Sequence, residues 1–229
     1  MEYPHNRPYT ADDLVRIITL LRDPVNGCPW DKVQTHTSIR MNFLEEAYEA
    51  VDALDLDDPV LMCEELGDVL MQVAFHTCME QETGRFTWEQ VCDGVCQKLI
   101  ERHPNIFGTQ PGYEGITDWD ALKNKEKGRR TLADDLESVP RAMPALMRAA
   151  KLQKRAARHG AALQGADAAA LAGAAENLQT AQPASAQAEQ AVGELLFAAA
   201  NLARQAGVDP EQALQKANEA FCTAAGPVA

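Results

Sequence analysis

The chain has 229 residues, of which 46% are hydrophobic and 24% are charged, and its net charge at pH 7 is −13. That length fits one large domain or two small ones, with enough apolar material for a core. The negative charge argues against a nucleic-acid or anionic-membrane surface, so we expect neither partner. No apolar run approaches the ~18 residues that cross a bilayer, and the first residues lack signal-peptide features, which predicts cytoplasmic residence. Six cysteines without a C-x-x-C pair are expected to be reduced core residues.

Nearly every periodic segment of the chain is typical of a helix. The first helix is expected to begin after Thr10, which opens a capping signature, and to stop near Asp23. A loop with Gly and Pro follows and presents Trp30. Further helices are expected over residues 43–54, 64–75, 87–102 and 142–158. Because we find no convincing strand, we predict an all-α fold made of tandem helical-bundle units, with a four-helix core around an acidic metal site.

The first acidic helix carries four carboxylates at helical spacing. Glu45, Glu49 and Asp52 share one stripe at about 100° per residue, and Glu46 lies beside it within reach of Glu49. The opposite side of the helix carries the apolar residues that we expect to be buried: Leu44, Ala47, Tyr48, Val51 and Leu54.

The second acidic helix places Glu65, Asp68 and Gln72 on one narrow face of an otherwise apolar segment. A helix with so little polar surface is normally buried, so we expect these acids to point into an enclosed space. Gly67 interrupts the helix at a cost of about 1 kcal/mol relative to Ala, which often marks the close approach of a backbone or a ligand. The short connection at residues 56–59 predicts a hairpin that brings the two acidic groups together.

Carboxylates that face one another repel and are costly to desolvate unless a cation lies between them. Mg²⁺, with Mn²⁺ as a second possibility, is the expected cofactor for a cluster of oxygen ligands. The alternative is a structural helical bundle whose acids are solvated, as acids on helices usually are.

An imperfect internal repeat indicates two related units. Residues 66–71 recur as 192–197, and residues 88–91 are echoed by 210–213. The second copy has no E-E-x-x-E, and Ala191 stands where Glu65 stands in the first. We therefore predict an intact domain at 1–135 and a degenerate helical domain at 136–229. Within the latter, the Ala/Gln-rich segment at about 161–190 is a candidate for a mobile linker.

The ordered motifs resemble those of the all-α nucleoside triphosphate pyrophosphohydrolases, and within them the MazG family. The acidic motifs E-E-x-x-E and E-x-x-D lie at residues 45–49 and 65–68. The other motifs that carry the resemblance lie at residues 21–24, 27–31, 34–36, 102–104, 119–127 and 151–156. The resemblance is dense over residues 10–160 and loose over 189–221.

This resemblance implies a Mg²⁺-dependent enzyme that cleaves nucleoside triphosphates to the monophosphate and pyrophosphate, acting as a homodimer. It implies a catalytic group of Glu45, Glu46 and Glu49, in which Glu45 is an accessory acid that ligates a metal or orients the attacking water. The implied metal ligands are Glu46, Glu49, Glu65 and Asp68.

Substrate contacts are expected from the basic stretches that follow the acidic hairpin. The candidate phosphate-binding residues are Lys98, Arg102, Lys123 and Lys127. Trp30 is a candidate for stacking on the nucleobase, because every base offers a π-face. The alternatives are a solvated lysine face and an aromatic lid over the core. We expect His36 and His76 to be core or capping residues.

The chain departs from the family pattern in its second unit. A Gly-Phe-Asp-Trp motif and a second acidic set are expected there, but the sequence is Gly160-Ala161-Ala162-Leu163 followed by the Ala-rich segment. We predict that hydrolysis resides in the first unit and that the second serves packing or dimerisation. The alternative function is a nucleotide-binding regulatory or dimerisation module without hydrolysis.

Overall fold

The computed structural model describes residues 3–5, 7–104, 106–108, 127–128 and 131–226, and every regular element within them is a helix. This confirms the all-α prediction. The chain divides into two compact units, Met1–Ile116 and Thr117–Ala229. Within the described ranges, no helix combines the length and apolar content needed to cross a membrane.

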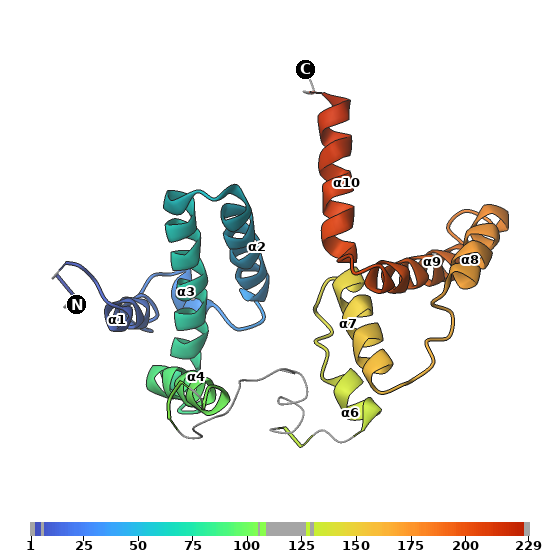
Figure 1. The fold of residues 1–229 in the computed structure, drawn as a ribbon. Coiled ribbons are helices and arrows are strands. Elements are labelled where there is room, and N and C mark those ends of the chain that lie inside the picture. The colour runs from blue at the N-terminus through green and yellow to red at the C-terminus, as the bar shows by residue number, and fades with distance from the viewer. Residues whose placement is uncertain (1–2, 6, 105, 109–126, 129–130, 227–229) are drawn as a thin grey trace. The chain divides into compact units, whose positions relative to one another are not determined.

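The first unit contains α1 (Ala11–Leu21), the short 3-10 helix η1 (Asp31–Val33), α2 (Arg40–Leu56), α3 (Pro59–Glu82) and α4 (Trp88–Arg102). Helix α3 is its central element, since α1, α2 and α4 all pack against it (Figure 1). The core joins α1, α3 and the start of α4 through Val15, Ile18, Ile39, Ala74, Phe75, Cys78, Met79 and Trp88.

The ends of α1 and α4 are fixed by the local signals expected from the sequence. At α1, Thr10 accepts from the backbone N–H of Asp13, whose side chain accepts from the Thr10 backbone in return. Thr87 and Gln90 form the same reciprocal arrangement at the start of α4. Such capping satisfies backbone donors that a helix start leaves unpaired.

Helices α2 and α3 form the expected hairpin, but α2 turns a different face toward its partner. Its buried residues are the small Ala50 and Ala53, of which Ala53 has no exposed surface. The apolar residues Tyr48, Val51 and Leu54 are instead about half exposed. The expectation that they are buried is therefore wrong for the described residues of this chain, because α2 packs on α3 through its small residues.

Helix α3 is buried along its second half only. Phe75, Cys78 and Met79 lie in the core, whereas Leu66 is 53% exposed. A side chain at Gly67 would meet no atom of the described residues within 4 Å, so the predicted close approach of a backbone is wrong, whereas the approach of a ligand stays a prediction. The first half of α3 is thus half-buried to exposed, with Glu65 and Asp68 among its half-buried residues.

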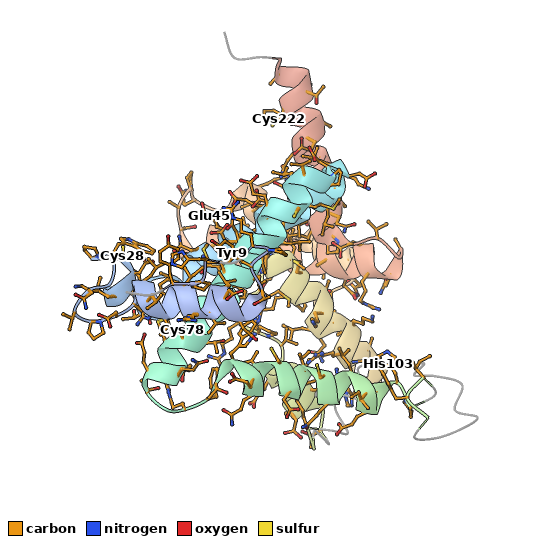
Figure 2. The ribbon with its side chains drawn as sticks, turned by 90° about the vertical axis from the view of Figure 1, so that its left-hand side faces the viewer. Tyr9, Cys28, Glu45, Cys78, His103 and Cys222 are labelled. Carbon is orange, nitrogen blue, oxygen red and sulfur yellow. The ribbon has the colours of Figure 1, made fainter. Side chains whose placement is uncertain are left out.

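The cysteines are all free, as expected, but only Cys78 is buried. Cys28 lies in the loop after α1, and Cys222 is exposed on α10 (Figure 2). The prediction of core cysteines therefore holds for one of the six.

The second unit contains α6 (Leu132–Glu137), α7 (Ala145–Arg158), α8 (Ala168–Thr180), α9 (Ala186–Gln205) and α10 (Pro210–Ala225). Helix α8 packs along α9 as α2 packs along α3. The Ala-rich segment predicted as a linker forms most of α8, because Asp167 caps it and its alanines have high helix propensity. Ala191, at the position of Glu65 in the repeat, is only 2% exposed.

Candidate functional site

The α2–α3 hairpin brings together carboxylates that are distant in the sequence. Glu46 and Glu49 lie on α2, one turn before the buried Ala50 and Ala53, and Glu65 lies on the first half of α3. One carboxylate oxygen from each of the three acids lies within 4.8 Å of the other two. We call Glu46, Glu49 and Glu65 the acidic trio.

The charge state of Glu46 reflects this crowding. Partial burial raises the pKa of the Glu46 carboxyl, and the hydrogen bond from Gln72 opposes that rise. The charges of Asp68 and Glu49 then raise the pKa further. In that hydrogen bond, the Gln72 amide Nε2 donates to Glu46 Oε1 at 3.4 Å, across the two helices.

Glu65 experiences the same effects from the α3 side. Partial burial raises its pKa, and the carboxylates of Glu49, Glu64 and Asp68 raise it further. A carboxyl whose pKa is raised by other carboxyls lies where a positive charge would be stabilised. The trio therefore has the oxygen donors and the electrostatic environment that suit a hard divalent cation.

The other two predicted acids differ in their relation to the trio. Asp68 lies outside the 4.8 Å group but acts electrostatically on both Glu46 and Glu65. Glu45 is exposed on α2 and is not a member of the group (Figure 2). The trio is half-buried to exposed, so the expectation of an enclosed space is wrong for this chain.

The candidate substrate-binding cations lie on other parts of the chain. Lys98 and Arg102 lie on α4, where Lys98 is exposed and Arg102 is half-buried. Lys127 is exposed beyond α4. Lys123 lies outside the described residues.

Trp30 lies on a loop whose backbone is held by hydrogen bonds, and its aromatic ring faces outward. The side chain is 57% exposed, so it is not a lid over the core. Arg22 fixes the loop, because its Nη1 donates to the backbone oxygens of Asp31 at 2.8 Å and Gln34 at 3.2 Å. A side chain at Gly27 would lie 2.4 Å from two backbone oxygens, so this sharp reversal requires glycine.

The two histidines predicted to be core or capping residues instead contact each other. The Nδ1 atoms of His36 and His76 lie 2.7 Å apart, which joins the loop to α3. Helical periodicity could not reveal this pair, because His36 lies in irregular structure. The available signal was the spacing of Asp68, Gln72, His76 and Glu80, four residues apart on a largely apolar helix.

Comparison with known proteins identifies the group to which the chain belongs. The family described as the MazG nucleotide pyrophosphohydrolase domain matches residues 34–107, which include α2, α3 and α4. The nucleoside triphosphate pyrophosphohydrolase of Escherichia coli (strain K12) is 41% identical over 227 residues, covering 92% of this chain and 83% of that protein. The chain belongs to the MazG family.

Two other MazG-related proteins extend this relationship. The Thermotoga maritima nucleoside triphosphate pyrophosphohydrolase/pyrophosphatase MazG is 38% identical, over 92% of this chain and 82% of its own length. The Mycobacterium tuberculosis nucleoside triphosphate pyrophosphohydrolase is also 38% identical, over 66% of this chain and 46% of its own length. The MazG resemblance seen in the motifs is therefore confirmed.

Proposed function

We propose that the chain hydrolyses nucleoside triphosphates to the monophosphate and pyrophosphate, with Mg²⁺ held at the acidic trio. The observation that carries the proposal is the convergence of three carboxylate oxygens within 4.8 Å on the hairpin matched by the MazG family. The names of the relatives, nucleoside triphosphate pyrophosphohydrolases, support the choice of substrate.

The chain supplies the cation site from both helices of the hairpin. Glu46 and Glu49 from α2 and Glu65 from α3 would hold the ion. Asp68, one turn further along α3, is assigned as the fourth ligand, and its charge already acts on Glu46 and Glu65. When bound, Mg²⁺ supplies charge neutralisation for the phosphates and lowers the pKa of a coordinated water. Mn²⁺ would fit the same oxygen donors. Glu45 is assigned the orientation of the attacking water or a supplementary ligand bond.

Positioning and charge stabilisation are what phosphoryl transfer chiefly needs from a protein. Lys98, Arg102, Lys123 and Lys127 are assigned to the phosphates. Trp30 is assigned to the base, because an exposed aromatic ring on a fixed loop loses little conformational entropy when it stacks on a ligand.

A homodimer is part of the proposal, supported by the apolar surface of the first unit. Tyr48, Val51 and Leu54 on α2 and Leu66 on α3 are each at least half exposed in the single chain. Contiguous apolar surface on a folded chain is typical of an interface. We assign hydrolysis to the first unit and packing or dimerisation to the second. Cytoplasmic residence stays a prediction.

The decisive experiment measures pyrophosphate release from a panel of nucleoside triphosphates, with and without Mg²⁺. Asp55→Ala is the control for Glu49→Ala, because both residues are exposed acids on α2 but only Glu49 belongs to the trio. We expect the control to be active and Glu49→Ala to be inactive. Nucleotide binding without release in the wild type would instead favour the non-hydrolytic regulatory module, and Mg²⁺-independent release would refute the metal assignment.

A further inference from the structure

His36 joins the loop between α1 and α2 to the second half of α3. Its Nε2 lies 2.6 Å from Oε1 of Glu80, and its Nδ1 lies 2.7 Å from Nδ1 of His76. The two imidazole rings are nearly parallel, with 7° between their planes. Both ring nitrogens of His36 are therefore engaged by α3.

Glu80 is buried and holds a second cationic partner. Nε of Arg85 lies 2.6 Å from Oε2 of Glu80, and Arg85 Nη2 donates to Oε1 at 2.7 Å. Loss of the His36 side chain would thus leave the buried carboxylate paired with Arg85. The fold of the first unit does not depend on His36 for this charge, which separates a positioning role from a structural one.

The His36–His76 contact accommodates one hydrogen between its two nitrogens. At 2.7 Å, one Nδ1 must carry the hydrogen and the other must accept it. Burial lowers the pKa of His76, and the proximity of His36 lowers it further. A second proton would place two N–H groups against each other and break the contact. Among the described residues, the charged groups linked to the pair by ion pairs are Glu80, which contacts His36, and Arg85, which contacts Glu80. Phe43 packs on His76 as a neutral ring.

The His36–His76 contact lies at a defined distance along α3 from the acids of the hairpin. His76 follows Asp68 by eight residues on α3, which is about 12 Å along a continuous helix. On the other side, the loop contributes exposed side chains rather than core, as Trp30 is 57% and Val33 66% exposed. The contacts at Arg22 and His36 therefore hold an outward-facing loop against the second half of α3.

We propose that His36, held between Glu80 and His76, is a positioning residue that fixes the 28–38 loop on α3 so that the loop binds the nucleotide. The loop is placed by the same helix that carries Glu65 and Asp68, so its position along α3 relative to these two acids is set before substrate arrives. Such preorganisation lowers the entropic cost of binding the nucleotide and leaves the rate of the chemical step unchanged. This inference rests on the proposed hydrolysis for its kinetic consequences, but the loop's attachment can be measured without it.

The first experiment compares His36→Ala with Thr37→Ala, an exposed neighbour on the same loop. Hydrogen exchange by mass spectrometry is expected to show faster exchange over residues 28–38 in His36→Ala only, with α3 unchanged. Kinetically, KM for the triphosphate should rise about tenfold while kcat stays within about twofold. His36→Gln, which can still donate to Glu80, should recover part of the lost affinity.

The second experiment uses pH, which a purely structural role would not affect in the same way. In the wild type at saturating Mg²⁺, KM should rise toward acidic pH, because the contact is lost once both imidazoles carry two protons. In His76→Asn, the amide oxygen can accept from a charged His36, so this acid-side rise should disappear. Comparing the pH profiles of KM in the wild type and in His76→Asn separates the effect of the histidine pair from that of carboxylates elsewhere.

Unchanged loop exchange in His36→Ala would overturn the inference, as would a fall in kcat at constant KM. An acid-side rise of KM that persists in His76→Asn would also overturn it. If the wild type shows no triphosphate hydrolysis, the proposed function fails, and the exchange experiment still decides whether His36 fixes the loop.

Discussion

Gln72 and Glu46 link the two acidic helices directly, through the 3.4 Å hydrogen bond from the Gln72 amide. Gln72 is buried, and its own side-chain oxygen has no partner among the described residues. A buried amide that donates to a metal-site carboxylate favours the ionised form of that carboxylate. Gln72 therefore opposes the rise in the pKa of Glu46 and favours the ionised form that a cation would bind.

Replacing Gln72 with Leu should weaken Mg²⁺ binding without unfolding the protein. The pKa of Glu46 would rise, since the hydrogen bond that opposes its rise is removed. We expect an apparent Mg²⁺ affinity about tenfold weaker, as for loss of a residue that supports a metal ligand. Calorimetric titration checks this, and Gln97→Leu, at an exposed position on α4, is the control. Equal affinity in both variants would contradict the role of Gln72.

Removing one ligand should abolish turnover and slightly stabilise the metal-free protein. In Glu49→Ala, we expect at least about a hundredfold loss of kcat. Without Mg²⁺, the variant should unfold at a higher temperature than the wild type, because Glu49 raises the pKa of both Glu46 and Glu65 and so destabilises their charged forms. Asp68→Ala should behave alike. Full activity, or a lower melting temperature without metal, would argue against this arrangement.

The thermal stabilisation by Mg²⁺ should grow as the pH rises from about 4 to 7. Because the folded pKa of Glu46 and Glu65 is raised, the metal-free folded state binds more protons than the unfolded state between about 4.3 and those higher values. The ionisation of these two groups therefore lowers the unfolding free energy of the metal-free protein as pH increases through that window. Bound Mg²⁺ would offset this decrease in unfolding free energy, and at low pH protons compete with Mg²⁺ for the carboxylates. Melting curves across this range check the trend, and a pH-independent Mg²⁺ effect would contradict it.

The α2–α3 contact should tolerate no larger side chain at Ala53. Because this residue has no exposed surface, Ala53→Leu forces the helices apart and should cost about 1–3 kcal/mol of unfolding free energy. Asp55→Leu is the control, because it introduces the same side chain on the exposed side of α2 and should change the unfolding free energy little. Urea denaturation of both variants checks the prediction; equal midpoints would show that the hairpin is not packed at Ala53.

The homodimer prediction can be tested on the exposed side of α2. We expect Leu54→Glu to shift the mass measured by light scattering toward one chain, because a carboxylate would be desolvated in the interface. Asp55→Ala, at a neighbouring exposed position of α2, is the control. A wild-type mass of a single chain would refute the dimer outright.

The predictable parts of this structure are those encoded by short-range contacts. Thr10 with Asp13 and Thr87 with Gln90 are three residues apart, so the sequence contains both partners of each cap. The acidic hairpin was also predictable, because a short connection leaves helices of this length few ways to pack. Its convergence of Glu46 and Glu49 with Glu65 follows from that geometry.

The unpredictable parts depend on which partner each helix face meets. Helix α2 has one stripe of alanines and one of larger apolar residues, and either could have faced α3. Periodicity ranks Tyr48 and Val51 as core, but the small Ala50 and Ala53 allow the closer approach and are buried. The His36–His76 contact joins a loop to a helix forty residues away, and no local pattern specifies such a pair.

Because Ala191 is buried and Glu65 is not, the two units differ in how well each position can accommodate a carboxylate. Glu65 stands at a partly open surface among other acids, where a bound cation would offset its charge. Ala191→Glu would place a carboxylate at a position of α9 that is only 2% exposed, where an unpaired charge costs several kcal/mol. A carboxylate at this position would thus disrupt the packing of α9 before it could serve as a ligand, so this single change would not give the second unit a copy of the trio.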